Sequence, residues 1–286
     1  MTVLPPLDEV LSAARASRRL AVDTEFVRER TYFPELALIQ VGARDPVTRD
    51  VISTVIDPLA PGVSSRFEAV AELLLSDDIV KVFHSGGQDL EVLRYTLGIV
   101  PRPIFDTQIA AAEVGLGRQL SYAATVELLL GLPLEKGNQR ADWLRRPLSP
   151  ELLAYARGDV EHLVPVAEAL EGRVRDADRE EAVFGRCARL VAEATQDETA
   201  SELAERVKGA TRLTGPARRR IEALAAWREA QARAHDVPRR WFAPDEALLA
   251  IAKAGPTSLI SLSDLRDVPA TLRSKHGQTM LDVIRG

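Results

Sequence analysis

Two acidic residues interrupt an apolar stretch near the start of the chain. Asp23 and Glu25 stand two positions apart in residues 20–26, which otherwise have the composition of a β-strand. Side chains two residues apart leave the same face of a strand, so we expect both carboxylates on one side of a sheet. Acids that point inward from an apolar element are costly unless a cation neutralises them. The pair therefore predicts a strand that carries part of a divalent-metal site.

Three more residues extend this pattern onto predicted helices. Tyr155 and Asp159 are four positions apart in a helical pattern, which places one above the other on a helix face. Residues 149–151, Ser-Pro-Glu, supply an N-cap, a proline at the first helical position and an acid in the first turn. We expect the helix to begin there. Asp89 lies at the start of another predicted helix, residues 89–97.

The order of the predicted elements indicates an α/β fold. Three apolar segments separated by short turns predict an antiparallel meander. These segments are residues 20–26, 36–41 and 51–57. A helix, a buried strand at 79–83, a second helix and a short strand at 104–106 follow, in the order of a βαβ unit. After an irregular stretch at 131–148 we expect helices only, and hence a mixed sheet flanked by helices with an all-helical C-terminal part.

Composition sets the broad class of the protein. At 286 residues, with 46% hydrophobic and 28% charged residues, the chain is expected to be globular with two domains. No apolar run approaches the roughly 20 residues that a membrane helix needs, and residues 1–8 lack the features of a signal peptide. Cys187 is the only cysteine, which excludes an internal disulfide and a cysteine-built zinc site. We expect a cytoplasmic protein with no membrane partner.

Charge is distributed unevenly along the chain. Residues 1–208 contain 24 basic and 34 acidic residues, whereas residues 209–286 contain 13 basic and 8 acidic residues. An acidic body with a basic C-terminal part is common when the smaller part helps to hold a polyanion. Compositional drift explains the asymmetry equally well, so charge alone does not identify the partner.

The acids match the chemistry of phosphodiester hydrolysis. This reaction needs an activated water, stabilised charge on the phosphoryl oxygens and help for the leaving alkoxide, and two divalent ions roughly 4 Å apart supply all three. Carboxylate oxygens select hard ions such as Mg²⁺ or Mn²⁺. Three aspartates and one glutamate from separate elements meet that demand. The neutral hydroxyl of Tyr155 is suited to hold the attacking water in line.

Each of these signals has a structural alternative. An isolated Asp-x-Glu is more often a solvated strand end, and Asp89 in a first helical turn also complements the helix dipole. Tyr155 also fits a role in filling core space. Asp106, which precedes Thr107, is expected to be an N-cap and nothing more. The order of the acids, and their placement on a strand, a helix start and a later helix, favours the metal site.

Three longer stretches resemble a known family. Residues 22–42, 83–93 and 155–160 resemble the three exonuclease motifs of ribonuclease D, in the DEDD superfamily of 3′–5′ exonucleases. Position 154 is an alanine where the histidine branch needs its general base, which favours the tyrosine (DEDDy) branch. The resemblance implies an RNase H-like (DnaQ-like) sheet and two Mg²⁺ or Mn²⁺ ions. The implied metal ligands are Asp23, Glu25, Asp89 and Asp159, with Tyr155 as the fifth catalytic residue, which places the water.

Residues 105–108 and 140–148 also resemble ribonuclease D. The second stretch is expected to line the path of the RNA, with basic side chains for phosphates and Trp143 for base stacking. A buried anchor for the loop is an equal alternative for Trp143. The predicted substrate contacts are Thr24, Phe26, Arg28, Arg30, His84, Lys136, Arg140, Trp143, Arg145 and Arg146. For Arg28 and Arg30 a solvated face is the alternative.

The segment from about Leu213 onward resembles the HRDC module of ribonuclease D and of RecQ-type helicases. This module is a small all-α bundle that binds nucleic acid. Its predicted phosphate contacts are Arg218, Arg219, Arg220, Arg239 and Arg240. We expect an exonuclease domain at residues 1–171, a helical connector at 172–208 and an HRDC domain at 209–286.

The resemblance implies a monomeric 3′–5′ exoribonuclease that releases nucleoside 5′-monophosphates from RNA with a free 3′ end. Precursors of tRNA and other small structured RNAs are the expected substrates. A DNA exonuclease with the same acids is one alternative, since a metal site contacts phosphates and does not distinguish ribose from deoxyribose. A non-catalytic RNA-binding protein that works through its HRDC module is another, and the complete set of acids argues against it.

Overall fold

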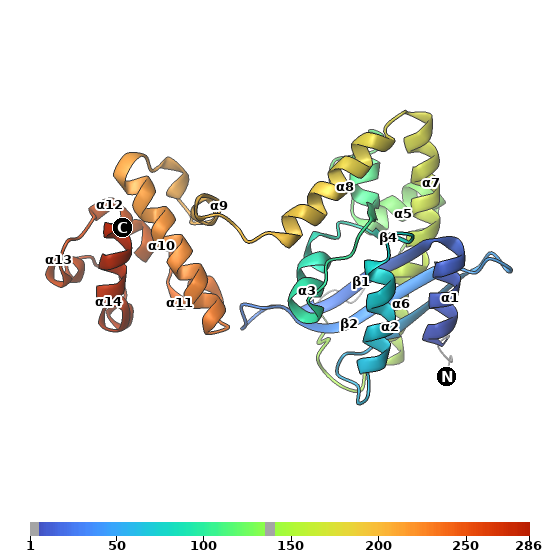
Figure 1. Cartoon of the computed structure of the whole chain (residues 1–286), viewed down its shortest axis with the longest axis horizontal. Coiled ribbons are helices and arrows are strands. Elements are labelled where there is room, and N and C mark those ends of the chain that lie inside the picture. The colour runs from blue at the N-terminus through green and yellow to red at the C-terminus, as the bar shows by residue number, and fades with distance from the viewer. Residues whose placement is uncertain (1–5, 135–140) are drawn as a thin grey trace. The chain divides into compact units, whose positions relative to one another are not determined.

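The chain folds into two compact units (Figure 1). The structure is a computed structural model that describes residues 6–134 and 141–286. The first unit holds the described residues up to Val27 and those from Pro34 to Gln196. The second unit holds Arg28–Phe33 and Asp197–Gly286. A short segment between two strands of the first unit therefore belongs to the second.

A five-stranded mixed sheet forms the centre of the first unit, in the order β3-β2-β1-β4-β5. The strands are β1 (Arg19–Val27), β2 (Glu35–Arg44), β3 (Val51–Ile56), β4 (Val80–Phe83) and β5 (Ile104–Asp106). Strands β1, β2 and β3 pair antiparallel, whereas β4 pairs parallel with both β1 and β5. The structure confirms the predicted meander and the βαβ unit that follows it.

Helices cover both faces of the sheet, so β2 is buried from Leu36 to Ala43. The helices of this unit are α1 (Leu7–Ser17), α2 (Ser64–Leu75), α3 (Gly87–Leu97), α4 (Thr107–Glu113), α5 (Tyr122–Leu130), α6 (Pro150–Glu161), α7 (Leu163–Asp176) and α8 (Glu180–Thr195). Helix α1 packs mainly on β2, and α6 lies across β1, β2 and β3 on the opposite face (Figure 1). Helix α1 has no counterpart among the predicted elements, although Leu7, Val10 and Leu11 recur at helical spacing.

Helix α6 begins where the sequence predicts. The side chain of Ser149 accepts a hydrogen bond from the backbone N–H of Leu152 at 3.3 Å, and Pro150 occupies the first turn. Gly42 on β2 allows the helix to approach the sheet, because a Cβ there would lie 3.4 Å from Val160. Side chains on the inner face of α6 are therefore close to β1. The described parts of the predicted irregular stretch, 131–134 and 141–148, form no helix or strand.

The second unit is helical wherever its residues form regular structure. Its elements are α9 (Ala200–Glu205), a 3₁₀ turn (Ala210–Arg212), α10 (Gly215–Ala234), α11 (Arg239–Phe242), α12 (Asp245–Ala254), α13 (Leu259–Ser263) and α14 (Ala270–Arg285). Ile221, Leu224 and Leu248 are fully buried in a core separate from the one around the sheet. This arrangement confirms the predicted small all-α bundle. Within residues 6–134 and 141–286, no helix combines the length and the apolar character needed to cross a membrane.

Candidate active site

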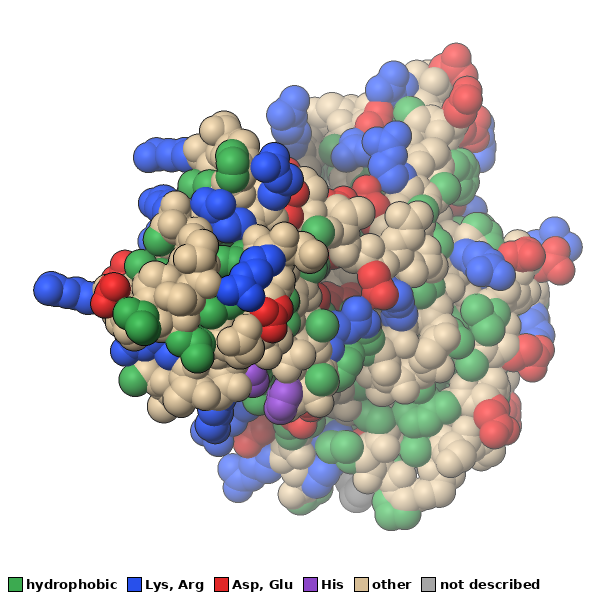
Figure 2. All heavy atoms as spheres, turned by 60° about the vertical axis from the view of Figure 1, so that its left-hand side comes forward, with side chains coloured by type: hydrophobic (Ala, Val, Ile, Leu, Met, Phe, Trp, Pro, Cys, Tyr) green, Lys and Arg blue, Asp and Glu red, His purple; other side chains and the backbone are tan. Residues whose placement is uncertain are grey.

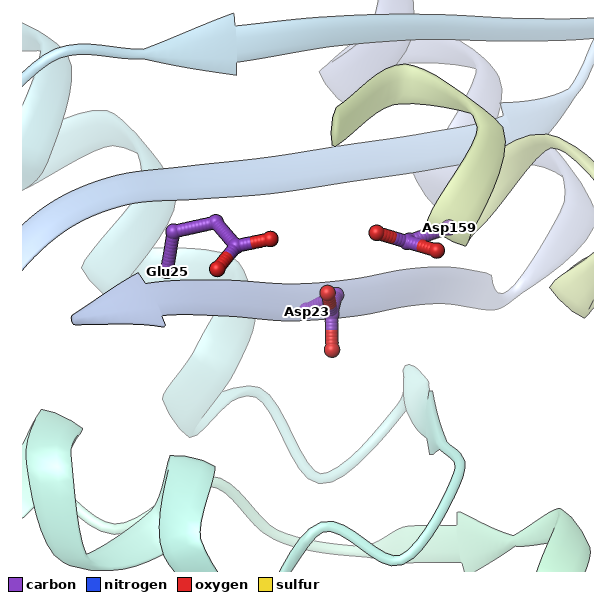
Figure 3. A group of neighbouring side chains, drawn as sticks. All are labelled: Asp23, Glu25 and Asp159. Atoms are coloured by element: carbon purple, nitrogen blue, oxygen red, sulfur yellow. The ribbon is translucent and has the colours of Figure 1, made fainter. Parts of the chain in front are cut away.

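Three carboxylates from two elements meet at the sheet (Figure 3). Asp23 and Glu25 project from the same face of β1, and Asp159 reaches them from α6. One oxygen from each side chain lies within 4.8 Å of the others. The i, i+2 spacing on the strand and the close approach of α6 thus bring together residues that are more than 130 positions apart in the sequence. Three of the four predicted metal ligands form one cluster.

Asp89, the fourth predicted ligand, is held against the backbone next to Asp23. One of its carboxylate oxygens accepts hydrogen bonds from the N–H of Thr24 at 3.1 Å and from the Thr24 hydroxyl at 2.5 Å. The last residue pair recorded between β1 and β4 is Ala21 with Val82, so the N–H of Thr24 lies beyond the parallel ladder. Asp89 at the start of α3 takes the place of a strand partner there. Asp89 is not part of the three-residue cluster.

The carboxyl groups have raised pKa values, and burial is the main cause for each. It raises the pKa of Glu25 to about 8, with further contributions from Asp159 and Asp89. Burial raises the pKa of Asp159 to about 7. The pKa of Asp89 rises to about 6 although the hydrogen bonds from Thr24 lower it. The pKa of Asp23 is well above its usual value because burial and then the three neighbouring acids disfavour its charged form.

These acids have the chemistry of a metal site. Like charges within a few ångströms in a partly buried setting need a compensating cation. In the described part of the chain, no lysine, arginine or histidine forms an ion pair with Asp23, Glu25 or Asp159. The donor set consists of carboxylate oxygens only, which suits a hard divalent ion such as Mg²⁺ or Mn²⁺ rather than zinc. The residues present therefore fit the divalent ions that the sequence predicts.

Two tyrosines lie close to the acids. Tyr155 is one helical turn before Asp159 on α6, with its ring 6.0 Å from that of Trp143. The hydroxyl of Tyr122 donates a hydrogen bond to the carbonyl oxygen of Gly158 at 3.1 Å. Burial and the charges of Asp159 and Asp23 raise the pKa of Tyr122, so its hydroxyl stays neutral. Tyr122 was not predicted to lie near the acids. Its place in the helical pattern of α5 gives no sequence signal for that position.

His84 is held by protein groups at both ring nitrogens. Its Nδ1 lies 2.8 Å from the hydroxyl of Thr107, and its Nε2 lies 3.0 Å from the carbonyl oxygen of Leu120. Its ring packs edge-on against Tyr122 at 5.6 Å. Burial lowers the pKa of His84, so the ring is neutral near pH 7. Both ring nitrogens of His84 thus have protein partners, and its predicted contact with substrate stays a prediction.

Trp143, in the loop before α6, is buried. This side chain is 2% exposed and packs in a small core with Leu38, Val55 and Ala156. Of the two equal alternatives for Trp143, burial therefore favours the anchor for the loop over base stacking.

The basic residues of this loop have different surroundings. Arg146 donates to both carboxylate oxygens of Asp57, at 2.6 and 2.7 Å, and to the carbonyl oxygen of Ala37 at 2.9 Å. Its guanidinium therefore holds the loop to the sheet. Arg145 is exposed. Lys136 and Arg140 lie outside the described residues.

The remaining predicted contacts on the first motif divide between the two units. Thr24 is the hydrogen-bond partner of Asp89, and Phe26 packs partly buried against the core of the first unit. Arg28 and Arg30 are exposed in the segment that belongs to the second unit. Arg28 donates through Nε to the carbonyl oxygen of Tyr32 at 3.1 Å.

Three of the five predicted HRDC arginines bind other parts of the second unit. Arg218 pairs with Glu222 at 2.6 Å, and Arg220 donates to the carbonyl oxygen of Ala252 at 2.7 Å. Arg239 forms ion pairs with Glu229 and with Glu198. Arg219 is exposed, and Arg240 is largely exposed with acidic partners no nearer than 3.6 Å.

Two further polar residues, Asp106 and Gln40, lie next to the elements that carry the acids. Asp106 caps α4, as predicted, and its carboxylate also accepts hydrogen bonds from the N–H groups of Ser85 and Gly86, just before α3. Gln40 pairs directly with Asp23 across β1 and β2, so both side chains lie on the same face. Gln40 is fully buried, and neither of its amide atoms has a partner among the described residues. A polar residue inside the apolar run 36–41 was the available signal for Gln40.

Comparison with known proteins agrees with this geometry. The family model described as 3′–5′ exonuclease matches residues 5–175, and the HRDC domain model matches residues 217–284. A ribonuclease D of Xanthomonas oryzae pv. oryzae is 39% identical over 256 residues, which cover 90% of this chain and 68% of that protein.

Solved structures give the same result. Escherichia coli RNase D, whose structure is described as that of an exoribonuclease involved in structured RNA processing, has a TM-score of 0.80 and 31% identity. The match covers 98% of this chain and 72% of that one. Brucella melitensis NrnC with bound Mg²⁺ has a TM-score of 0.55 and 25% identity, over 67% of this chain and 88% of that one. The chain belongs to the ribonuclease D family of 3′–5′ exonucleases.

Proposed function

We propose that the protein is a 3′–5′ exoribonuclease that hydrolyses the terminal phosphodiester of RNA and releases nucleoside 5′-monophosphates. The observation that carries this proposal is the cluster of Asp23, Glu25 and Asp159, with oxygens within 4.8 Å of one another and no basic partner in the described chain. Asp89 joins them as the fourth acid beside Thr24. These four side chains would hold two Mg²⁺ or Mn²⁺ ions. The Mg²⁺ bound to Brucella melitensis NrnC supports this choice.

The divalent ions, when bound, supply water activation and charge neutralisation at the phosphoryl group. The chain itself supplies positioning. The sheet and α6 fix the carboxylates, and the pKa values raised by burial support the need for a nearby cation. The hydroxyl of Tyr155, one turn from Asp159, is suited to orient the attacking water by a hydrogen bond. Tyr155 acts as an orienter rather than as a base.

The substrate class follows from the relatives. Escherichia coli RNase D is described as acting in structured RNA processing, so we infer that RNA with a free 3′ end is the substrate. Precursors of tRNA and other small structured RNAs are the proposed examples. A cytoplasmic, monomeric enzyme is part of the same proposal.

The test is a tRNA precursor with a 5′ label and a short 3′ tail, incubated with Mg²⁺ or with a chelator. We expect stepwise shortening that stops near the mature 3′ end and requires the metal. Asp159→Asn should lower the rate roughly 100-fold or more. Mutation of a residue that only hydrogen-bonds to a metal ligand already lowers activity about 10- to 100-fold. Asp78→Asn, which removes an exposed carboxylate elsewhere on the first unit, is the matched control and should leave the rate unchanged.

Three outcomes would contradict the proposal. Random internal cuts would indicate an endonuclease. Equal decay of a matched DNA strand would favour the DNA exonuclease alternative. Full activity of Asp159→Asn would remove the acid cluster from the mechanism.

A further inference from the structure

The second unit has an aromatic pocket of about 450 Å³ on its surface. We use this name for the hollow between the turn after α10, helix α11 and helix α14. The residues that line it include His235, Trp241, Phe242, Lys275 and His276. All of them lie in the second unit, so the pocket is complete within that unit.

The rings of this pocket form a connected group anchored in the core. Phe242 lies 5.1 Å from His276 and 5.5 Å from His235, measured between ring centroids. Trp227, which is 9% exposed, packs edge-on against both Phe242 and His276, at 5.6 and 5.8 Å. A buried tryptophan thus fixes the orientation of the rings that line the hollow. The rings at the floor of the pocket are therefore held by contacts with one another and with the core.

Trp241 stands at the rim of the aromatic pocket with 66% of its surface exposed. Tryptophan has a large apolar ring, and leaving it in water gives up the stabilisation that burial provides. The side chain contributes nothing to the core of the second unit. Exposure of such a ring beside a preformed aromatic hollow indicates a ligand with flat faces.

The charge of the pocket is positive, and none of the described residues that line it is acidic. Lys275 supplies an exposed ammonium group. The pKa of His276 is lowered by burial and by the nearby His235 and Lys275, so its ring is neutral near pH 7 and serves as an aromatic surface. Figure 2 shows histidine side chains, in purple, at the surface of the part turned toward the viewer, beside hydrophobic side chains.

Trp241 also borders a second hollow of about 420 Å³, whose lining contains arginines together with the acids Glu29 and Asp245. Arg206 pairs there with Glu198 at 2.6 Å, and Arg240 lies 3.6 Å from Asp245, so the charges of these arginines are partly neutralised. Lys275 remains the cation of the aromatic pocket. A nucleic-acid strand matches this pocket, because its bases stack on aromatic rings while its phosphates require a cation. A double helix does not present base faces, so the fitting ligand is an unpaired nucleotide.

We propose that the aromatic pocket binds an unpaired nucleotide of single-stranded RNA, with its base against Trp241 and Phe242 and a flanking phosphate at Lys275. The choice of RNA rests on the proposed function, whereas the pocket itself rests on the ring geometry, the exposure of Trp241 and the absence of acids among the described residues of its lining. The residues differ from Arg218, Arg220 and Arg239, whose guanidinium groups bind other parts of the unit.

The test measures binding of a fluorescein-labelled 12-nucleotide oligo(A) RNA to the full chain by anisotropy. A chelator keeps the strand intact, so the result does not depend on hydrolysis. Trp241→Ala should weaken binding about 5- to 100-fold, the range for loss of one base-stacking ring. Trp241→Phe should retain most of the affinity. Lys275→Ala should weaken binding and lower its salt dependence, because one phosphate contact is lost.

Two control variants match these changes in the same unit. Ile260→Ala removes another exposed hydrophobic side chain, 78% exposed on α13, and Lys253→Ala removes another exposed lysine, on α12. Neither residue lines the pocket, so both variants should bind like the parent chain. Circular dichroism checks that each variant is folded.

Equal affinity of Trp241→Ala, Lys275→Ala and the two controls would overturn the proposal and would point to a protein partner for the exposed ring. Equal competition by an RNA duplex would also overturn it, because the pocket requires an accessible base. Normal binding together with absent nuclease activity would refute only the proposed function.

Discussion

At the scale of single residues, the site depends on three partly buried carboxyl groups and on Asp89, which is buried. Asp23, Glu25, Asp89 and Asp159 all have raised pKa values, chiefly because burial disfavours their charged forms. This cost exists before any ion binds. It makes the metal-free site unstable in its charged form and the metal-bound site favourable.

The raised pKa values predict how stability changes with pH. In the unfolded chain the carboxyl pKa values are about 4, whereas in the folded chain Asp159 and Glu25 have values of about 7 and about 8. The folded state therefore binds more protons between about pH 4 and pH 8. The free energy of unfolding of the metal-free protein should fall as the pH rises through this interval.

Urea denaturation in chelator at several pH values measures this fall. Asp159→Asn removes one titrating group and should make the decrease smaller. Added Mg²⁺ should stabilise the parent protein most at the high end of the interval, where the carboxylates are charged. Stability that rises with pH in chelator would refute this account of the acids.

Gln40 gives a second prediction at this scale. Its amide is fully buried and has no hydrogen-bond partner among the described residues. An unsatisfied buried polar group costs about 1–3 kcal/mol of stability. Gln40→Leu keeps a similar volume and should raise the free energy of unfolding of the metal-free protein by about 1 kcal/mol or more.

Equilibrium denaturation checks the Gln40 prediction. Ser53→Ala is the opposite control, because Ser53 is buried but hydrogen-bonded to Glu161 and Arg157, and its loss should destabilise the protein. A lower stability of Gln40→Leu would show that the amide has a stabilising partner.

At the scale of elements, the turn between β4 and α3 decides where Asp89 lies. The carboxylate of Asp106 accepts hydrogen bonds from Ser85 and Gly86 and also caps α4. One side chain thus ties the ends of two parallel strands to the starts of two helices. The position of Asp89 follows from this turn and from its hydrogen bonds to Thr24.

Gly86 is the sensitive point of this turn. A Cβ at this position would lie 2.6 Å from the Cβ of Phe83, which is buried on β4. Gly86→Ala should therefore shift the start of α3, lower the free energy of unfolding by about 1–3 kcal/mol and reduce the hydrolysis rate by displacing Asp89.

Denaturation and rate measurements on the same sample test this prediction. Gly172→Ala on α7 is the control, because nothing lies within 4 Å of its added Cβ. That change should stabilise the protein by up to about 1 kcal/mol through helix propensity. Equal behaviour of the two variants would mean that the turn adapts without cost.

At the scale of the whole molecule, the chain passes from one unit to the other at three places, after residues 27, 33 and 196. The segment Arg28–Phe33, which leaves β1 directly after the first motif, is part of the second unit. Tyr32 is buried there, and its hydroxyl donates to Glu229. The carboxylate of Asp236 accepts hydrogen bonds from the N–H groups of Tyr32 and Phe33 at 2.9 and 3.0 Å.

Asp236 should therefore control the order of this segment. Asp236→Gly removes the carboxylate while accommodating the positive φ of 48° at this position. Two charge-assisted hydrogen bonds are lost, so the amides of Tyr32 and Phe33 should exchange with deuterium about tenfold faster or more. Asp178→Gly, an exposed aspartate with φ of 55°, is the control and should leave these amides unchanged. Unchanged exchange in Asp236→Gly would show that other contacts hold the segment.

Local sequence patterns were sufficient for most of the elements, though not for α1, and for the identity of the acids. The apolar runs predicted the three strands of the meander, and residues 149–151 predicted the start of α6. These features depend on neighbours along the chain, such as strand periodicity, an N-cap and a proline, so they can be read without the fold. The motifs likewise named Asp23, Glu25, Asp89 and Asp159.

Only the tertiary structure decided which groups meet and which are already occupied. It placed three acids in one cluster and held Asp89 against Thr24, it buried Trp143, and it paired Arg146 with Asp57. It also assigned Arg28–Phe33 to the second unit. The reason is physical, because burial and hydrogen-bond partners come from packing between residues far apart in the chain. The sequence alone does not distinguish a charged side chain that faces solvent from one that has an internal partner.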